Sequence, residues 1–172
     1  GAGGGGGGGA GARVRLSAAA AGAVRGPVWA GLDVRGAKTL PLRKPRHDGS
    51  GRRVATVRGE MHGAGNVVDP GLGSHPQHAL AKKQTKGFGG MISVLTGSRE
   101  NAAKVLGKVK IFSLAESLGG VESLISHPAS MTHASVEPER RAQLGITEDL
   151  IRLSCGVEDV TDLLAALEQA FA

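Results

Sequence analysis

Residues 111–125 have the sequence Ile-Phe-Ser-Leu-Ala-Glu-Ser-Leu-Gly-Gly-Val-Glu-Ser-Leu-Ile. A polar pair, Glu116 and Ser117, and then two glycines, Gly119 and Gly120, interrupt an otherwise apolar stretch. Glycines in such a place let a backbone approach a ligand closely, because they have no Cβ atom. The stretch therefore predicts strands near residues 110–115 and 121–125. Between them it predicts a loop whose backbone is shaped around a ligand.

A second informative segment is Leu-Ile-Arg-Leu-Ser-Cys-Gly at 150–156. Its strict alternation predicts a strand with Arg152 and Ser154 on the polar face and Ile151, Leu153 and Cys155 facing inward. The planar guanidinium of an arginine can hold both oxygens of a carboxylate, which a lysine cannot do. Arg152 is therefore a candidate carboxylate clamp. The competing interpretation is an ion pair with a nearby acid such as Glu148 or Glu158.

Composition divides the 172-residue chain. Residues 1–65 hold 18 of the 29 glycines and 11 Lys/Arg against 3 Asp/Glu, whereas the rest has 10 against 12. A basic, Gly-rich arm could neutralise the phosphates of a nucleic acid, but Trp29 is its only aromatic residue for stacking on bases. No nucleic-acid partner is expected. The folded core must come mostly from the later part of the chain.

Two features of the sequence bear on where in the cell the protein is located. No apolar run approaches the roughly 20 residues that span a bilayer, so no membrane association is expected. Cys155 is the only cysteine and cannot form an internal disulfide. A reducing compartment, the cytoplasm, is therefore the expected location.

The pattern along the chain predicts three regions. Residues 1–21 are too rich in glycine and alanine to offset the entropy of ordering and are expected to be disordered. Residues 22–66 are expected to fold poorly by themselves, because Pro45, Gly49 and Gly51 oppose a continuous helix; the family resemblance given below implies that they are a degenerate interdomain linker. Residues 67–172 form the folded C-terminal domain.

Within that domain the signals alternate between helix and strand. Helices are expected at 76–86, after the cap Ser98, between Pro138 and Gly145, and along a final face that ends at Phe171. Strands are expected at 91–96, 110–115, 121–125 and around Arg152. Most connections are too short for parallel crossovers. The expected fold is therefore α+β, with a mainly antiparallel four-stranded sheet and helices on one face.

Five ordered blocks carry a family resemblance. They are Pro70-Gly71-Leu72 with Ser74 to His78, Lys86 to Met91, Leu114 to Leu124, His127 to Ser135, and Leu150 to Ser154. In order and spacing they resemble the C-terminal domain of the Cys/Met-metabolism pyridoxal-phosphate enzymes, the transsulfuration family. The Glu-Ser-Leu-Gly-Gly-Val-Glu-Ser-Leu form looks most like that of cystathionine gamma-lyases and gamma-synthases.

The resemblance implies the small C-terminal domain of a fold-type-I pyridoxal-phosphate-dependent transferase that works as a homotetramer on sulfur amino acids. It implies that the cofactor, pyridoxal 5′-phosphate, is held mainly by a large domain preceding this chain, together with the Schiff-base lysine. No catalytic or cofactor-binding residue is then expected here, and the chain alone is expected to be inactive.

The same resemblance assigns substrate-binding roles to four residues. Arg152 would clamp the substrate α-carboxylate, and Ser117 would help to orient that carboxylate and the catalytic lysine. Glu116 would face the distal part of the substrate, and Thr132 would add to the same site.

Two alternatives remain open. The chain is either a fragment that acts when joined to its large domain, or a stand-alone, non-catalytic domain that binds an amino acid or associates with full-length family subunits. A metal site at His75 and His78 is not expected, because no further ligands at a known spacing accompany them.

Overall fold

The computed structural model describes residues 13, 17, 26–60 and 67–172. Apart from residues 13 and 17, the segment 1–21 expected to be disordered lies outside these described residues. The chain divides into two compact units, Gly1–Leu40 and Pro41–Ala172. In the first unit, α2 (Pro27–Lys38) begins with a proline in its first turn and buries none of its residues. Three of its large apolar side chains, Val28, Trp29 and Leu32, are exposed.

Helix α3 runs without interruption from Leu40 to Glu60, and all of it after Leu40 belongs to the second unit. The expectation that Pro45, Gly49 and Gly51 oppose a continuous helix is wrong. The physical reason is packing, which overrides helix propensity here. A Cβ atom on Gly51 would lie 2.8 Å from the carbonyl oxygen of Gly89, so this glycine lets α3 pack directly against the backbone of a neighbouring loop.

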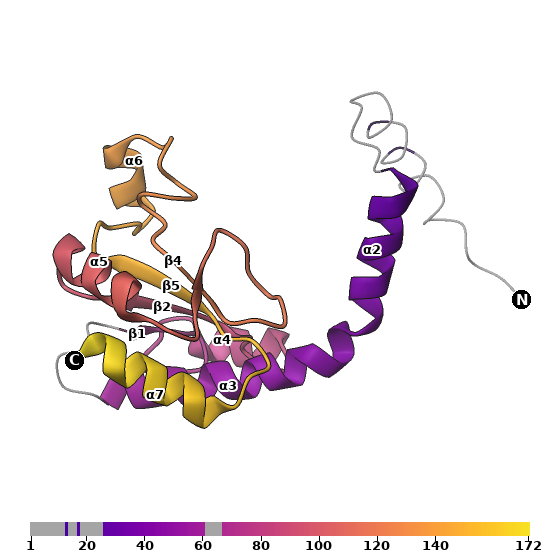
Figure 1. Ribbon diagram of the computed structural model, residues 1–172, viewed down its shortest axis with the longest axis horizontal. Helices are drawn as coiled ribbons and strands as arrows, with labels where there is room; N and C mark the ends of the chain where they lie inside the picture. Colours follow the sequence, from indigo (N-terminus) through magenta and orange to yellow (C-terminus); the bar gives the residue numbers. More distant parts are fainter. Residues whose placement is uncertain (1–12, 14–16, 18–25, 61–66) are drawn as a thin grey trace, which may run out of the picture. The chain divides into compact units, whose positions relative to one another are not determined.

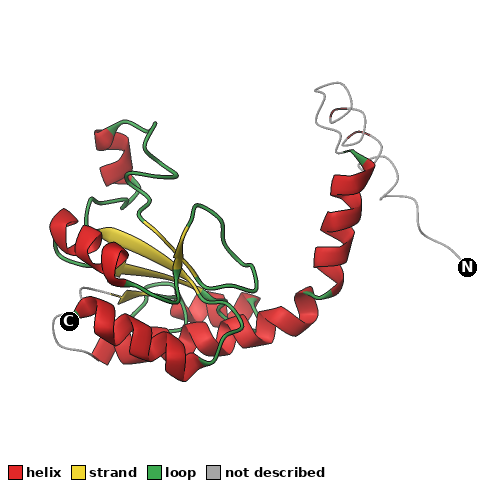
Figure 2. Ribbon diagram, in the orientation of Figure 1, coloured by secondary structure: helices red, strands yellow, loops and turns green. Residues whose placement is uncertain are grey.

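Five strands form one sheet in the order β1-β2-β5-β4-β3 (Figure 2). Their bounds are Val67–Val68, Met91–Leu95, Ser113–Leu114, Leu124–Ser126 and Leu150–Ser154 for β1 to β5. The β1–β2, β2–β5 and β5–β4 pairs are antiparallel, and β4–β3 is parallel. The expected α+β class with a mainly antiparallel sheet is confirmed. The expected number of four strands is wrong, because two-residue β1 is too short to show a period-two pattern.

The remaining helices of this unit are α4 (His78–Gln84), α5 (Arg99–Lys108), α6 (Pro138–Gln143) and α7 (Val160–Phe171). Ser98 caps α5 as expected, since its hydroxyl oxygen accepts the Asn101 N–H at 3.1 Å. Figure 1 shows α3 and α7 side by side along the sheet. Arg46 of α3 reaches the carbonyl oxygen of Glu158, just before α7, at 3.2 Å.

One hydrophobic core lies between the sheet and helices α3, α5 and α7. The strands contribute Ile92, Val94, Ile125, Ile151 and Leu153, and the helices contribute Val54, Ala55, Ala102, Val105, Leu163 and Leu167. The expected domain limits at residues 22 and 67 stay predictions, although α3 shares this core. No described helix is long and apolar enough to cross a membrane.

Candidate functional site

The alternation of β5 places Arg152 on the sheet face opposite the core. Its neighbours Ile151 and Leu153 are fully buried among the core residues, so the side chain between them points to the other face. The register sets Arg152 between Ser93 of β2 and Ser126 of β4. Both flanking residues are small, which leaves room around the guanidinium group.

A depression on this face brings together all four residues that the resemblance assigns to substrate binding. Arg152, Glu116, Ser117 and Thr132 all line this shallow depression. Its other lining residues are Met91, Leu118, Leu124, Ile125, Ser126 and Ser154. Sequence reasoning assigned no role to these six. Among them, only Ser154 could have been found from the sequence, because the alternation of the predicted strand places it on the same polar face as Arg152.

Backbone hydrogen bonds hold both ends of the loop that carries Glu116 and Ser117, one to β4 and one to the segment after β5. At its start, the Ala115 N–H donates to the carbonyl oxygen of Ile125 at 3.0 Å. At its end, the Val157 N–H donates to the carbonyl oxygen of Val121 at 2.9 Å. Gly119, in the middle of the loop, has φ +72°, a left-handed conformation that favours glycine. The loop lies between β3 and β4, where the sequence places it, and its shaping around a ligand stays a prediction.

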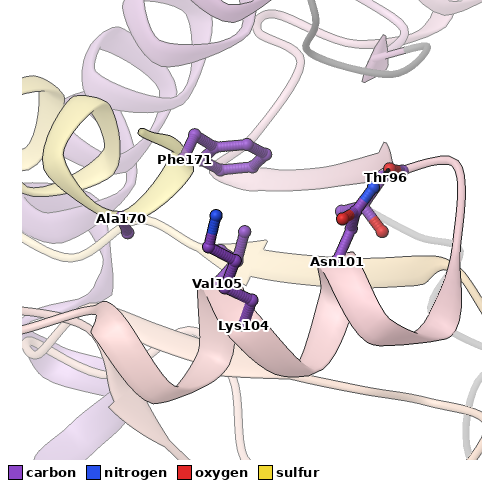
Figure 3. Close-up of a pocket in the computed structure, with 6 residues that line it drawn as sticks. All are labelled: Thr96, Asn101, Lys104, Val105, Ala170 and Phe171. Carbon is purple, nitrogen blue, oxygen red and sulfur yellow. Dashed lines mark hydrogen bonds between the residues drawn. The ribbon is translucent and has the colours of Figure 1, made fainter.

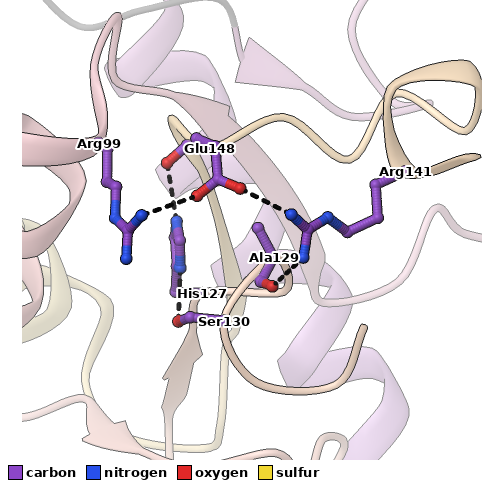
Figure 4. A network of polar contacts seen from close by, with 6 residues as sticks. All are labelled: Arg99, His127, Ala129, Ser130, Arg141 and Glu148. Atoms are coloured by element: carbon purple, nitrogen blue, oxygen red, sulfur yellow. Dashed lines mark hydrogen bonds and ion pairs between the residues drawn. The ribbon is translucent and has the colours of Figure 1, made fainter. Parts of the chain in front are cut away.

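A polar network supports the segment that carries Thr132 (Figure 4). His127 is buried, and its two ring nitrogens contact Ser130 Oγ at 2.7 Å and the Glu148 carbonyl oxygen at 2.8 Å. The carboxylate of Glu148 pairs with Arg141 at 2.9 Å and with Arg99 at 3.7 Å. These contacts hold the turn after β4 against the connection that enters β5.

Arg141 completes this network. One nitrogen of its guanidinium contacts Glu148, and another donates to the carbonyl oxygen of Ala129 at 2.8 Å. Its side chain is only 14% exposed. The arginine therefore fixes the backbone three residues before Thr132 and links it to the strand that carries Arg152.

Arg152 itself has no carboxylate within ion-pairing distance among the residues that the structure describes. Glu148 is engaged by Arg99 and Arg141, and Glu158 accepts hydrogen bonds from the N–H and the hydroxyl of Ser123. The alternative pairing with Glu148 or Glu158 is therefore absent. A half-buried guanidinium without an acidic neighbour is suited to an anionic ligand.

Other cavities lie elsewhere in this unit. One lies between α5 and α7, where Thr96, Asn101, Lys104, Val105, Ala170 and Phe171 line it (Figure 3). The polar side chains of Thr96 and Asn101 there are already hydrogen-bonded within the protein. A larger, open cavity beside α3 includes Lys44 and Lys86 but none of the predicted substrate-binding residues. No arginine lines either of these two cavities.

The histidines that raised the question of a metal site have structural partners. His78 Nδ1 lies 2.8 Å from the carbonyl oxygen of Pro70, and its ring stacks on Phe88. His75 Nδ1 accepts the Gln77 N–H at 3.1 Å. Both side chains thus stabilise the turn and the helix start in which they lie.

The fold and the depression together define a class of protein. An arginine on the polar face of a mixed sheet, beside a Glu-Ser-Leu-Gly-Gly loop, is what the family resemblance leads us to expect. The sequence profile of the Cys/Met metabolism PLP-dependent enzymes matches residues 7–172. The chain belongs to this family.

Individual relatives agree. The chain is 50% identical over 151 residues to a cystathionine gamma-synthase of Mycobacterium bovis, which covers 87% of this chain and 38% of that protein. It is also 50% identical over 149 residues to a cystathionine gamma-lyase of Bacillus subtilis, with 87% and 39% covered. The chain thus spans under two fifths of the length of these curated relatives.

A solved structure shows the same fold. The cystathionine gamma-lyase CalE6 from Micromonospora echinospora superposes with a TM-score of 0.85 at 40% identity, and the match covers 93% of this chain and 42% of that one. The agreement confirms the expected family and its fold. It leaves the roles of individual residues in this chain as predictions.

The family depends on pyridoxal phosphate, but the depression does not fit that cofactor by itself. The ten lining residues include no lysine that could form a Schiff base, and Arg152 is their only cation. They provide one carboxylate, four hydroxyl groups and an apolar rim. This donor set fits the carboxylate and polar end of an amino acid better than a phosphate-bearing ring.

Proposed function

We propose that this chain provides the substrate-carboxylate site of a cystathionine gamma-synthase or gamma-lyase type enzyme, which carries out elimination or replacement on sulfur amino acids. The observation that supports the proposal is the Arg152 guanidinium, which lies in the depression beside the Glu116-Ser117 loop with no acidic partner among the described residues. The lysine that carries the cofactor would come from outside the lining of this depression.

Four of the lining residues then have a role. Arg152 binds both oxygens of the α-carboxylate through two parallel N–H···O bonds. Ser117 adds a hydroxyl donor that orients the same carboxylate. Glu116, the only acid that lines the depression, faces the distal end of the substrate, where it attracts a cationic group. Thr132, carried on the segment that the Glu148 network supports, adds a further hydroxyl.

The test is an NMR titration of the ¹⁵N-labelled chain with L-cystathionine. The wild-type chain is expected to show saturable shifts in the amides of residues 116–119 and 152. Arg152→Lys keeps the charge but loses the bidentate fork, and is expected to weaken binding by at least about tenfold. Arg53→Lys, an exposed change on α3, serves as the matched control and is expected to bind as the wild type does.

Two results would contradict the proposal. One is an absence of saturable binding by the wild-type chain at millimolar L-cystathionine. The other is equal binding by the wild type and by Arg152→Lys, which would show that the bound amino acid does not use the guanidinium fork.

A second candidate function is association with full-length family subunits. It is favoured by α2, on which Val28, Trp29 and Leu32 are 74%, 64% and 53% exposed. Exposed apolar clusters of this kind mark interaction surfaces. Light scattering of the chain mixed with the M. bovis cystathionine gamma-synthase tests this idea, and the Trp29→Glu variant is expected to abolish any complex.

The proposal includes the homotetramer that the resemblance implies for the complete enzyme.

The proposal also includes a cytoplasmic location. It is supported by Cys155, a buried free cysteine on the core side of the sheet. Burial, followed by the charges of Glu158 and Asp69, raises the pKa of its thiol to about 12, so it acts as an apolar core residue.

A further inference from the structure

Ser154 lies on the same sheet face as Arg152 and touches the loop opposite it. Its hydroxyl oxygen accepts the N–H of Gly119 at 2.9 Å, and its side chain is almost fully buried. This bond joins two segments that are 35 residues apart in the sequence. It therefore connects the strand that carries the carboxylate clamp to the loop that carries Glu116 and Ser117.

This contact is one of the few that hold the tip of the loop. Glu116, Ser117 and Leu118 are all exposed. The backbone bonds at Ala115 and Val121 tie down only the two ends. The bond from Gly119 to Ser154 reaches the middle of the loop, where His47 also interacts with the backbone of Gly120.

We propose that Ser154 is a positioning residue: through Gly119 it sets the distance and orientation of Glu116 and Ser117 relative to Arg152. The inference rests on the proposed function, since it assigns Ser154 to the same substrate site. Its consequence is selectivity. Arg152 is fixed by its own strand and binds any α-carboxylate, whereas recognition of the distal end of a longer amino acid requires the loop in place.

The hydroxyl suits this task chemically. A serine oxygen has two lone pairs and one O–H donor, so accepting the Gly119 N–H leaves its hydrogen available. The side chain also lines the depression, so that hydrogen can be donated to a bound anion. An alanine at this position would keep the strand but remove the acceptor, and would leave the half-buried Gly119 N–H without its partner.

The experiment compares Ser154→Ala, Ser154→Thr and Ser93→Ala in the full 172-residue chain. Thr keeps a hydroxyl at the same branch position and is the rescue variant. Ser93 flanks Arg152 on β2 but does not line the depression, so Ser93→Ala is the matched control. The readouts are hydrogen exchange of the Gly119 amide and the Kd values for L-cystathionine and for glycine, which lacks a distal group.

In Ser154→Ala we expect exchange of the Gly119 amide to accelerate by about tenfold, the effect of losing one hydrogen bond. The Kd for L-cystathionine should rise by about five- to tenfold and that for glycine by less than about twofold, so the ratio of the two changes. Ser154→Thr should restore both readouts to within about twofold of the wild type, and Ser93→Ala should leave both unchanged.

Either of two results would overturn the inference while leaving the proposed function intact. In the first, Arg152→Lys weakens binding but Ser154→Ala changes neither Gly119 exchange nor the ratio of Kd values. In the second, both ligands weaken equally and all amides exchange faster together, which would reveal a purely structural role. A wild-type chain that binds neither ligand would instead overturn the proposed function and this inference with it.

Discussion

The guanidinium carbon of Arg58 lies 3.7 Å from the centroid of the Phe171 ring. Arg58 is near the end of α3 and is almost fully buried, whereas Phe171 is the last residue of α7. At the other end of the same pair of helices, Arg46 contacts the residues that begin α7. The two helices are thus joined at both ends by arginines of α3.

A double-mutant cycle measures the Arg58–Phe171 contact. We expect Phe171→Leu to lower the free energy of unfolding more in the wild-type chain than in Arg58→Met, with a coupling energy of about 0.5–2 kcal/mol. Denaturant unfolding followed by circular dichroism provides the values. The same cycle with the exposed Arg53 in place of Arg58 should give no coupling, and zero coupling for Arg58 would show that the ring only fills space.

Gly51 and Gly49 lie on the same helix and should respond in opposite directions to alanine. A Cβ atom on Gly51 would meet the carbonyl oxygen of Gly89 at 2.8 Å and Gly90 Cα at 2.9 Å, so Gly51→Ala should destabilise the chain by about 1–3 kcal/mol. Gly49 is exposed with nothing within 4 Å, so Gly49→Ala should stabilise it by about 0.5–1 kcal/mol. Equal effects in thermal unfolding would show that α3 does not need its close approach to the Gly89-Gly90 loop.

The pH dependence of stability should contain a contribution from Asp69. Burial is the main cause that raises the pKa of this carboxyl above its ordinary value of 3.8, and the nearby Asp48 adds to the effect. The native state therefore holds the proton more tightly than the unfolded chain. Asp69 contributes most to stability below pH 3.8, and this contribution is lost as the pH rises through the raised pKa.

The Asp69→Asn variant tests this sign. The stability of this variant relative to the wild type should increase as the pH rises from 3 toward 7. The reason is that the wild type must then carry a buried charge, which the asparagine lacks. Urea unfolding across that range is the measurement. Asp162→Asn, on the exposed side of α7, provides the comparison. A difference between Asp69→Asn and wild type that does not vary with pH would contradict the prediction.

Arg141 and Arg140 are neighbours with different surroundings. Arg141 bonds to Ala129 and Glu148, whereas the exposed Arg140 bonds only to Gln143 among the described residues. Arg141→Met should cost about 1–3 kcal/mol of unfolding free energy and shift the amides of residues 127–132, whereas Arg140→Met should cost less than about 0.5 kcal/mol. Similar values for the two would mean that the network does not support the Thr132 segment.

Much of the C-terminal part was predictable because its signals are local. Ser98 caps α5 where a serine before an apolar helical pattern predicts a cap, and Gly145, with φ +72°, follows the end of α6 as expected. The grouping of Arg152, Glu116, Ser117 and Thr132 in one depression agrees with what the family resemblance implies. Their roles in binding stay predictions until a ligand is tested.

The sequence by itself determined the periods of β2, β5, α5 and α7, the α+β class and the polar face of β5, since these depend on side chains a few residues apart. Only the tertiary structure decided the rest. The continuity of α3 through Pro45 and Gly51, the added strand β1 and the bond between Gly119 and Ser154 all depend on partners that are distant in the chain. Close packing between such segments outweighs local propensity, and no local pattern encodes it.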